Sequence, residues 1–214
     1  MNISLPVTSK RTGTPSLKVS NMKIRSKVTI GLLSSVMCMA AVAAAANGYK
    51  KASGPKDGIT FKTKAIGGAM TIEGKAGRLE YAEQVGGDLL FKANLFLVKT
   101  GMDGRDEHLR DVLKVQVYKD DKAKTEKFKY AKLKVPVSSV SVGKGKTGNG
   151  KFTINGQEAP LKFTYDAEKK GGKVEVHAWF PLKLTEHGVD KICKLGVCVE
   201  DLINVDVNFA LTPP

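Results

Sequence analysis

The sequence predicts an all-β fold of about eight antiparallel strands in a single domain. From Gly58 onward, apolar residues recur at every second position, which is the period of a strand with one buried face. Turns that contain glycine or asparagine separate these runs. The chain from Asn47 to Pro214 has the size of one ordinary domain with one core. About eight short strands in one domain are typical of a barrel or a sandwich.

The first 46 residues resemble an export signal rather than a part of this domain. Residues 22–27 supply three basic side chains, the apolar run Val28–Ala46 follows, and Ala44 and Ala46 are the small residues that precede a cleavage site. We therefore expect residues 1–46 to be a signal peptide with an upstream extension, cleaved after Ala46, and the mature protein to be periplasmic. Translation starts either at the first methionine or at Met22. A transmembrane anchor is the alternative, which the alanine-rich composition and the cleavage-like end of the run disfavour.

Cleavage at this point leaves a basic protein. It removes six basic residues and no acidic residue, so the formal net charge falls from +14 to +8. Such a charge suits nucleic acid, an anionic membrane surface or simply solubility, and export makes nucleic acid the poorest of the three. We expect residues 47–57 to form a short lead into the domain at residues 58–214.

The first strands are expected between Gly58 and Val98. In Gly58–Ala65 the odd-numbered residues are mostly apolar and Lys62 and Lys64 alternate with them, and a second run begins at Met70 after a Gly-Gly break. Arg78–Glu83 continues this second strand, and another Gly-Gly pair turns it. Leu89–Val98 is apolar on both faces, which predicts a central strand.

A dense group of ionic residues follows at Thr100–Asp111. Both charge signs surround Leu109, so we expect a short helical turn near residues 105–111 in which neighbouring side chains pair and the leucine points inward. Asp106 and His108 are the residue types of a general acid–base pair, so an enzyme active at this corner is an alternative. Salt bridges and a backbone cap explain the same residues without catalysis.

The second half of the chain continues the alternation. We expect a strand at Leu113–Tyr118, a charged turn at Lys119–Lys127, a strand at Phe128–Val135 and a glycine-lysine turn at residues 143–150. Two strands then flank Asn155-Gly156, a dipeptide that favours a positive-φ turn. The last strands place the following apolar residues on one face: Val174, Val176, Ala178 and Phe180, then Ile203, Val205, Val207, Phe209 and Leu211.

The mature chain keeps two of its three cysteines, Cys193 and Cys198. An even pair in an exported protein predicts a disulfide that closes a short loop. A redox pair or half of a metal site is the alternative, but the spacing is not CxxC and the loop contains no histidine. We expect neither a metal nor a cofactor, because the three histidines, His108, His177 and His187, lack metal-ligand spacing.

Three segments resemble the YceI-like family of exported, lipocalin-like β-barrels. These are LVKTGMDGRDEHLRD at Leu97–Asp111, GKFTINGQEAPLKFTY at Gly150–Tyr165 and VDVNFAL at Val205–Leu211. The first has a threonine at the end of a strand and then an RDxHL motif, so the resemblance assigns a structural role to Thr100, Arg105, Asp106, His108 and Leu109. It also implies a single antiparallel barrel with an apolar tunnel that binds a polyisoprenoid or similar amphiphilic lipid.

On this basis we expect a lipid-binding protein rather than an enzyme. The residues expected to line the tunnel are Phe61, Ile72, Phe96, Val98, Leu109, Phe163, Val176 and Phe180. The alternatives are an enzyme that acts on a lipid-linked substrate at the Arg105–Asp111 corner, and an accessory protein that uses its positive charge at an anionic membrane surface without a ligand. The sequence leaves open whether the interior is hollow or filled, and whether the chain is a monomer or a dimer.

Overall fold

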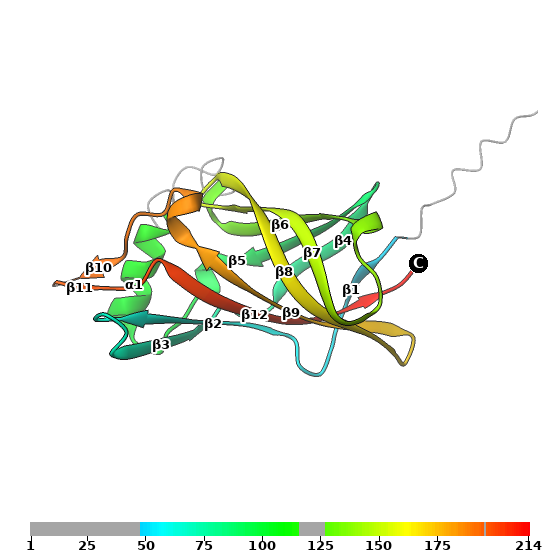
Figure 1. Cartoon of the computed structure of the whole chain (residues 1–214), viewed down its shortest axis with the longest axis horizontal. Coiled ribbons are helices and arrows are strands. Elements are labelled where there is room, and N and C mark those ends of the chain that lie inside the picture. The colour runs from blue at the N-terminus through cyan, green and yellow to red at the C-terminus, as the bar shows by residue number, and fades with distance from the viewer. Residues whose placement is uncertain (1–47, 116–126, 195) are drawn as a thin grey trace, which may run out of the picture. The chain divides into compact units, whose positions relative to one another are not determined.

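The computed structural model describes residues 48–115, 127–194 and 196–214, and these residues form a mostly β structure with one α-helix (Figure 1). The expected signal peptide at residues 1–46 and the expected turn at Lys119–Lys127, apart from Lys127, lie outside the described residues. The strands of the main sheet are β1 (Lys50–Ala52), β2 (Gly58–Ala65), β3 (Met70–Lys75), β4 (Leu79–Val85), β5 (Asp88–Asn94), β6 (Tyr130–Pro136), β7 (Gly143–Ile154), β8 (Gln157–Lys170), β9 (Lys173–Lys183) and β12 (Leu202–Thr212).

The main sheet closes on itself through its last strand. One edge of β12 pairs with β9, and its other edge pairs first with β2 and then with β1. β1 and β2 are therefore two segments of one barrel strand, interrupted by residues 53–57. β3 and β4 form the next strand in the same way, because β2 pairs with β3 and β1 pairs with β4. With these segments joined, the ring has eight antiparallel strands, which confirms the predicted fold class. The expected lead at residues 47–57 contributes β1 to this ring.

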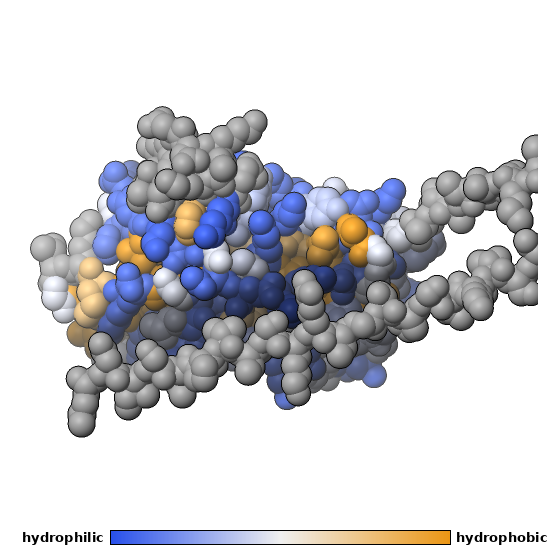
Figure 2. All heavy atoms as spheres, turned by 90° about the horizontal axis from the view of Figure 1, so that it is seen from above, coloured by the Kyte–Doolittle hydropathy of each residue, from blue (hydrophilic) through white to orange (hydrophobic). Residues whose placement is uncertain are grey.

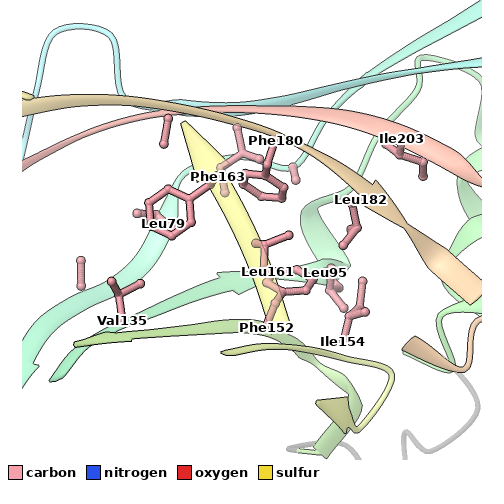
Figure 3. Packing of buried hydrophobic residues seen from close by; sticks show 14 of the residues in the cluster. Leu79, Leu95, Val135, Phe152, Ile154, Leu161, Phe163, Phe180, Leu182 and Ile203 are labelled. Carbon is pink, nitrogen blue, oxygen red and sulfur yellow. The ribbon is translucent and has the colours of Figure 1, made fainter. Parts of the chain in front are cut away.

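The inner face of the barrel carries the apolar residues of the alternation. Every odd-numbered residue from Ile203 to Leu211 in β12 and every even-numbered residue from Val174 to Leu182 in β9 faces the interior, as the period of two predicts. Phe152, Phe163 and Phe180 converge there from three neighbouring strands (Figure 3). On the side of the barrel seen in Figure 2, the coloured surface is mostly hydrophilic.

β7 corrects the glycine-lysine turn that was predicted at residues 143–150. This segment is extended and pairs with β8 from Gly143 to Ile154. Its glycines are required by close neighbours: a Cβ on Gly148 would lie 2.3 Å from Cζ of Phe163, and a Cβ on Gly150 would lie 2.7 Å from the carbonyl oxygen of Lys134. The real turn comes later, at Asn155 and Gly156, whose φ angles of 51° and 71° fit the predicted positive-φ turn.

Helix α1 (Asp103–Val112) corrects a second prediction. The expected short turn is a ten-residue helix, and its hydrogen bonding continues past its end, with Leu113 N–H donating to the Leu109 carbonyl and Val115 N–H to that of Arg110. The predicted strand at Leu113–Tyr118 is therefore a turn over its described residues, although Leu113 and Val115 are both buried.

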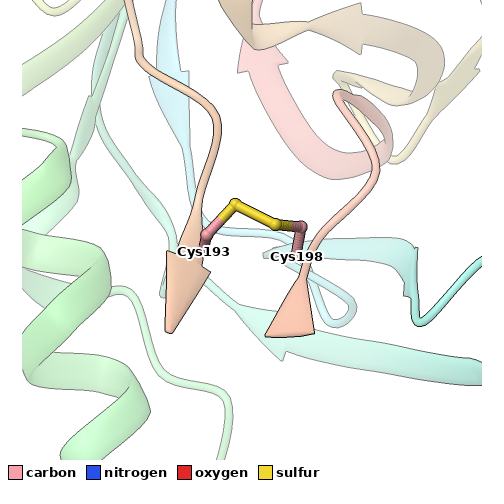
Figure 4. Close-up of a disulfide and its surroundings, with 2 residues drawn as sticks. All are labelled: Cys193 and Cys198. Atoms are coloured by element: carbon pink, nitrogen blue, oxygen red, sulfur yellow. A yellow bond between two sulfur atoms is a disulfide. The ribbon is translucent and has the colours of Figure 1, made fainter. Parts of the chain in front are cut away.

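The ends of the barrel differ. α1, the β2–β3 turn and a small hairpin of β10 (Cys193–Lys194) and β11 (Val197–Cys198) lie at one end, and the β4–β5 turn, the β8–β9 turn and the C-terminus lie at the other (Figure 1). Cys193 and Cys198 form the predicted disulfide in register across the hairpin, with a Cα–Cα distance of 4.1 Å (Figure 4). The hairpin is held to β2, because Glu200 N–H donates to the Lys64 carbonyl.

Candidate ligand cavity

A cavity occupies the interior of the barrel. Its volume is about 240 Å³, whereas a single water needs only about 10–15 Å³, so the interior is hollow rather than filled. Residues from all eight barrel strands line it, together with Leu109 and Leu113 from the α1 region and Leu95 and Leu184 from 3₁₀ helices at Leu95–Leu97 and Leu184–His187.

The cavity is lined by leucines at the α1 end and reaches the surface at the opposite end. The leucines of the α1 region are half-buried or buried. At the other end Val140, Ser141 and Val142 line the cavity, and Val142 is 45% exposed. We call this opposite end the mouth; it comprises the start of β1, the β4–β5 turn, residues 137–146 and the β8–β9 turn.

The wall of the cavity carries no charge. Of the lining residues, only Tyr49, Ser141 and Tyr165 have a polar side chain, and all three are hydroxyls. The Tyr165 hydroxyl is already satisfied, because it accepts from Ser141 N–H at 2.9 Å and donates to the Ser141 carbonyl at 3.2 Å. Such a wall offers contacts to an apolar chain and no partner for an ionised group inside.

Six of the eight residues expected to line a tunnel do lie on the cavity wall. These are Phe61, Val98, Leu109, Phe163, Val176 and Phe180. Phe96 does not, because β5 ends at Asn94 and a 3₁₀ helix replaces the predicted strand; the Asn94 side chain accepts from Phe96 N–H at 3.0 Å. Ile72 is buried opposite Thr63, beyond the last β2 residue that pairs with β12, and so lies outside the cavity.

Most of the wall was not singled out from the sequence. Phe91 and Phe209 meet edge to face across it at 5.3 Å between ring centroids, and Phe152 lies 6.1 Å from Phe180. The signal that could have identified them was the alternation itself, because each of these residues shares a strand face with residues that line the cavity.

The ionic corner is built around the carboxylate of Asp106, which is 5% exposed. It accepts from Thr100 N–H at 2.6 Å and from the Thr100 hydroxyl, while Arg105 donates to the Thr100 hydroxyl at 2.7 Å and to its carbonyl at 2.8 Å. Burial by itself would raise the pKa of Asp106, but the two hydrogen bonds from Thr100 and the charges of Arg110 and Arg105 hold it below its ordinary value. The network fixes the start of α1, which places Leu109 on the cavity wall.

The histidines lie in three separate places. Nε2 of His108 is buried without a hydrogen-bond partner, and the Asp106 carboxylate accepts its hydrogen bonds from Thr100. His177 contacts Asp206 at 2.6 Å on the outer face, and His187 lies edge-on against Phe152. Within residues 48–115, 127–194 and 196–214, no three histidine, cysteine, aspartate or glutamate side chains are grouped to hold a metal ion. No helix in the same ranges is both long enough and apolar enough to span a bilayer.

Comparisons with known proteins agree with this architecture. Residues 51–211 match the family model of the YceI-like domain. A polyisoprenoid binding domain from Saccharophagus degradans, implicated in plant cell wall breakdown, superposes with a TM-score of 0.57 at 13% identity, over 78% of this chain and 99% of that one. BcnA from Burkholderia cenocepacia superposes with a TM-score of 0.52 at 13% identity, over 72% and 96% of the two chains. No curated protein sequence matches this chain.

Proposed function

Because this chain belongs to the YceI-like family, we propose that it is an exported protein that holds a polyisoprenoid or similar long-chain lipid in the barrel. The observation that carries the proposal is the cavity of about 240 Å³, whose wall is apolar except for three hydroxyls. Each buried CH₂ group of a ligand contributes about 0.8 kcal/mol, so ten buried carbons contribute about 8 kcal/mol before the cost of association is subtracted. The S. degradans neighbour, described as a polyisoprenoid binding domain, supports the same class of ligand.

Native mass spectrometry of protein secreted to the periplasm of an expression host tests this proposal. We expect the wild-type protein to carry a lipid mass, or to take up an added isoprenoid or fatty amide. A homogeneous ligand-free mass with no uptake of either probe would refute it.

A pair of variants on β6 makes the test specific to the cavity. Ala131 lines the wall opposite Ala93, whereas its neighbour Lys132 lies on the outer face. Ala131→Trp fills the cavity and should abolish lipid uptake, while Lys132→Trp should leave it unchanged. Equal uptake by both variants, each shown to be folded by circular dichroism, would place the ligand elsewhere.

We also propose export to the periplasm, with cleavage after Ala46. The basic, apolar and alanine-rich order of residues 22–46 supports this, as does the disulfide between Cys193 and Cys198, since such bonds persist in oxidising compartments. Mass spectrometry of the fractionated protein should find a mature chain that begins at Asn47. A cytoplasmic chain that retains residues 22–46 would contradict it.

We assign no catalysis to the ionic corner. The Asp106 carboxylate is buried and accepts hydrogen bonds from the backbone and the hydroxyl of Thr100, which fits a structural role. An Asp106→Asn variant should lose stability, and its lipid retention should fall only in proportion. Loss of a measurable turnover on a lipid-linked substrate with folding intact would instead support an enzyme.

A further inference from the structure

The lysines at the mouth lie on both faces of the barrel wall, some on the inner face and some on the outer face. Residues directly opposite each other on antiparallel strands share a face. Lys146 lies opposite Tyr165, Lys169 opposite Val174, and Lys51 opposite Leu211. Tyr165, Val174 and Leu211 all line the cavity, so these three lysines belong to the inner face.

The acidic residues of the mouth are all on the outer face. These residues are Glu83, Asp88, Asp166, Glu168 and Glu175. The last four are each next in sequence to a residue that lines the cavity, so they point to the opposite face. Glu83 pairs with Leu90, which lies between the lining residues Leu89 and Phe91. Each also has a donor already, respectively the Tyr81 hydroxyl, Lys134, Gly145 N–H, Lys144 and Lys170. Within the described residues, Lys51, Lys146 and Lys169 have no carboxylate in ion-pair range.

Lys169 and Lys51 lie at the two ends of one row of paired residues at the rim. Lys169, Val174, Leu211 and Lys51 are consecutive partners across β8, β9, β12 and β1. Three strand spacings separate the ends of this row, which is about 15 Å, and an extended lysine from each end covers much of that span. The row thus places one ammonium group at each end, with the apolar side chains of Val174 and Leu211 between them leading into the cavity.

Lys146 adds a third ammonium group from a residue that lies two inward-facing rows further in, opposite Tyr165. The β7–β8 register shifts between Gly143 and Lys146, and the Lys146 Nζ lies 3.6 Å from the position that a Cβ on Gly143 would take. Irregularities of this kind at a barrel rim change the direction of a side chain. Here the ammonium group lies near Gly143, the residue that follows Ser141 and Val142 of the cavity wall in the chain.

From this arrangement we infer that the mouth binds the anionic head of the ligand, a phosphate or a carboxylate, while its chain lies in the cavity. The inference rests on the proposed function and deepens it, because it names the class of lipid. The uncharged wall cannot stabilise an ionised head inside, and at the α1 end the lining residues are leucines. Among the described residues, Lys51, Lys146 and Lys169 of the inner rim supply cations without an ion-pair partner beside an apolar entrance.

Binding of geranylgeranyl monophosphate and geranylgeraniol to delipidated protein, measured by titration calorimetry, tests the inference. The two probes share one chain and differ only in the head. We expect the wild-type protein to bind the phosphate at least about tenfold more tightly than the alcohol, since charge-assisted contacts of this kind are worth such a factor.

Matched variants locate the effect. The inner variant combines Lys51→Gln, Lys146→Gln and Lys169→Gln, and the outer variant combines Lys50→Gln, Lys144→Gln and Lys170→Gln, which changes the net charge equally on neighbouring residues. The inner variant should bind both probes with the affinity of the alcohol, and the outer variant should keep the wild-type preference. Retained binding of geranylgeraniol shows that the inner variant is folded.

The other outcomes overturn the inference in distinguishable ways. Equal wild-type binding of the two probes would refute the anionic head and leave the lipid-binding function standing. If the outer variant loses the preference for the phosphate probe as fully as the inner variant does, the overall positive charge of the protein, not the inner rim, attracts the phosphate. Inorganic phosphate that binds alone as tightly as the lipid phosphate would make this a site for the free ion. Binding of neither probe would refute both proposals.

Discussion

Gly148 gives the sharpest test of how β7 packs against β8. A Cβ at this position would lie 2.3 Å from Cζ and 2.5 Å from Cε2 of Phe163, which stands directly opposite it. The Phe163 ring is 8% exposed and lies on the cavity wall, so it can yield only by leaving its rotamer and its packing. Gly148→Ala is therefore expected to strain the barrel rather than to stabilise a strand.

The expected magnitude follows from two opposing effects. Displacing the ring costs about 0.5–1.5 kcal/mol in side-chain torsion and about 1 kcal/mol more in lost packing. Replacing a strand glycine by alanine gains about 0.5–1 kcal/mol because the unfolded chain loses less entropy on folding. Gly148→Ala should thus lower the free energy of unfolding by about 0.5–2 kcal/mol.

A double-mutant cycle isolates the contact. In a Phe163→Leu background the ring is absent, so Gly148→Ala should have no cost or should stabilise by up to about 1 kcal/mol, which gives a coupling energy of about 2 kcal/mol. Urea unfolding followed by circular dichroism measures all four proteins, with Asn149→Ala on the exposed face as a control. A penalty for Gly148→Ala below about 0.5 kcal/mol, or the same penalty in both backgrounds, would refute the reasoning.

Three further predictions concern the corner, the disulfide and the β7–β8 turn. Asp106→Asn should lower the free energy of unfolding by about 1–3 kcal/mol at pH 7. Because the pKa of Asp106 is lowered in the folded state, this difference should persist above about pH 5 and shrink as the pH falls through the folded pKa. A difference independent of pH in urea unfolding would contradict the charge network. Replacing both Cys193 and Cys198 by serine should lower stability by about 2 kcal/mol, because so short a loop constrains the unfolded chain little, and a calorimetric loss above about 4 kcal/mol would show a larger role. Asn155→Gly keeps the positive φ but loses the 2.6 Å hydrogen bond to the Gly188 carbonyl, so it should cost about 1 kcal/mol and Asn155→Ala clearly more; equal thermal stabilities would argue against strain at this turn.

The elements that the sequence predicted correctly depend on local patterns. The alternation in β9 and β12 names the inner face residue by residue, because a strand turns its side chains to opposite faces whatever lies around it. Asn155-Gly156 likewise identifies its own turn, since the φ angles required are properties of those two residues. An even pair of cysteines behind an export signal predicted the disulfide between Cys193 and Cys198, which the structure contains.

The predictions that failed depend on contacts that neither composition nor alternation reveals. Residues 143–150 have the composition of a turn, but the neighbouring Phe163 ring and the Lys134 carbonyl require glycine in a strand there. Leu113 and Val115 alternate like strand residues, but the helix before them runs on into a turn that buries both. Phe96 lies on a 3₁₀ helix, where successive residues no longer alternate between two faces.

By itself, the sequence determined an all-β domain of about eight strands, the apolar residues that share one face of its last strands and the resemblance to one family of barrels. Only the tertiary structure decided that the strands close into a ring, that the ring leaves a cavity, and that unpaired lysines gather on the inner rim of its mouth. The physical reason is that the period of two is set within each strand, whereas the space between opposite walls depends on how all eight strands tilt and pair.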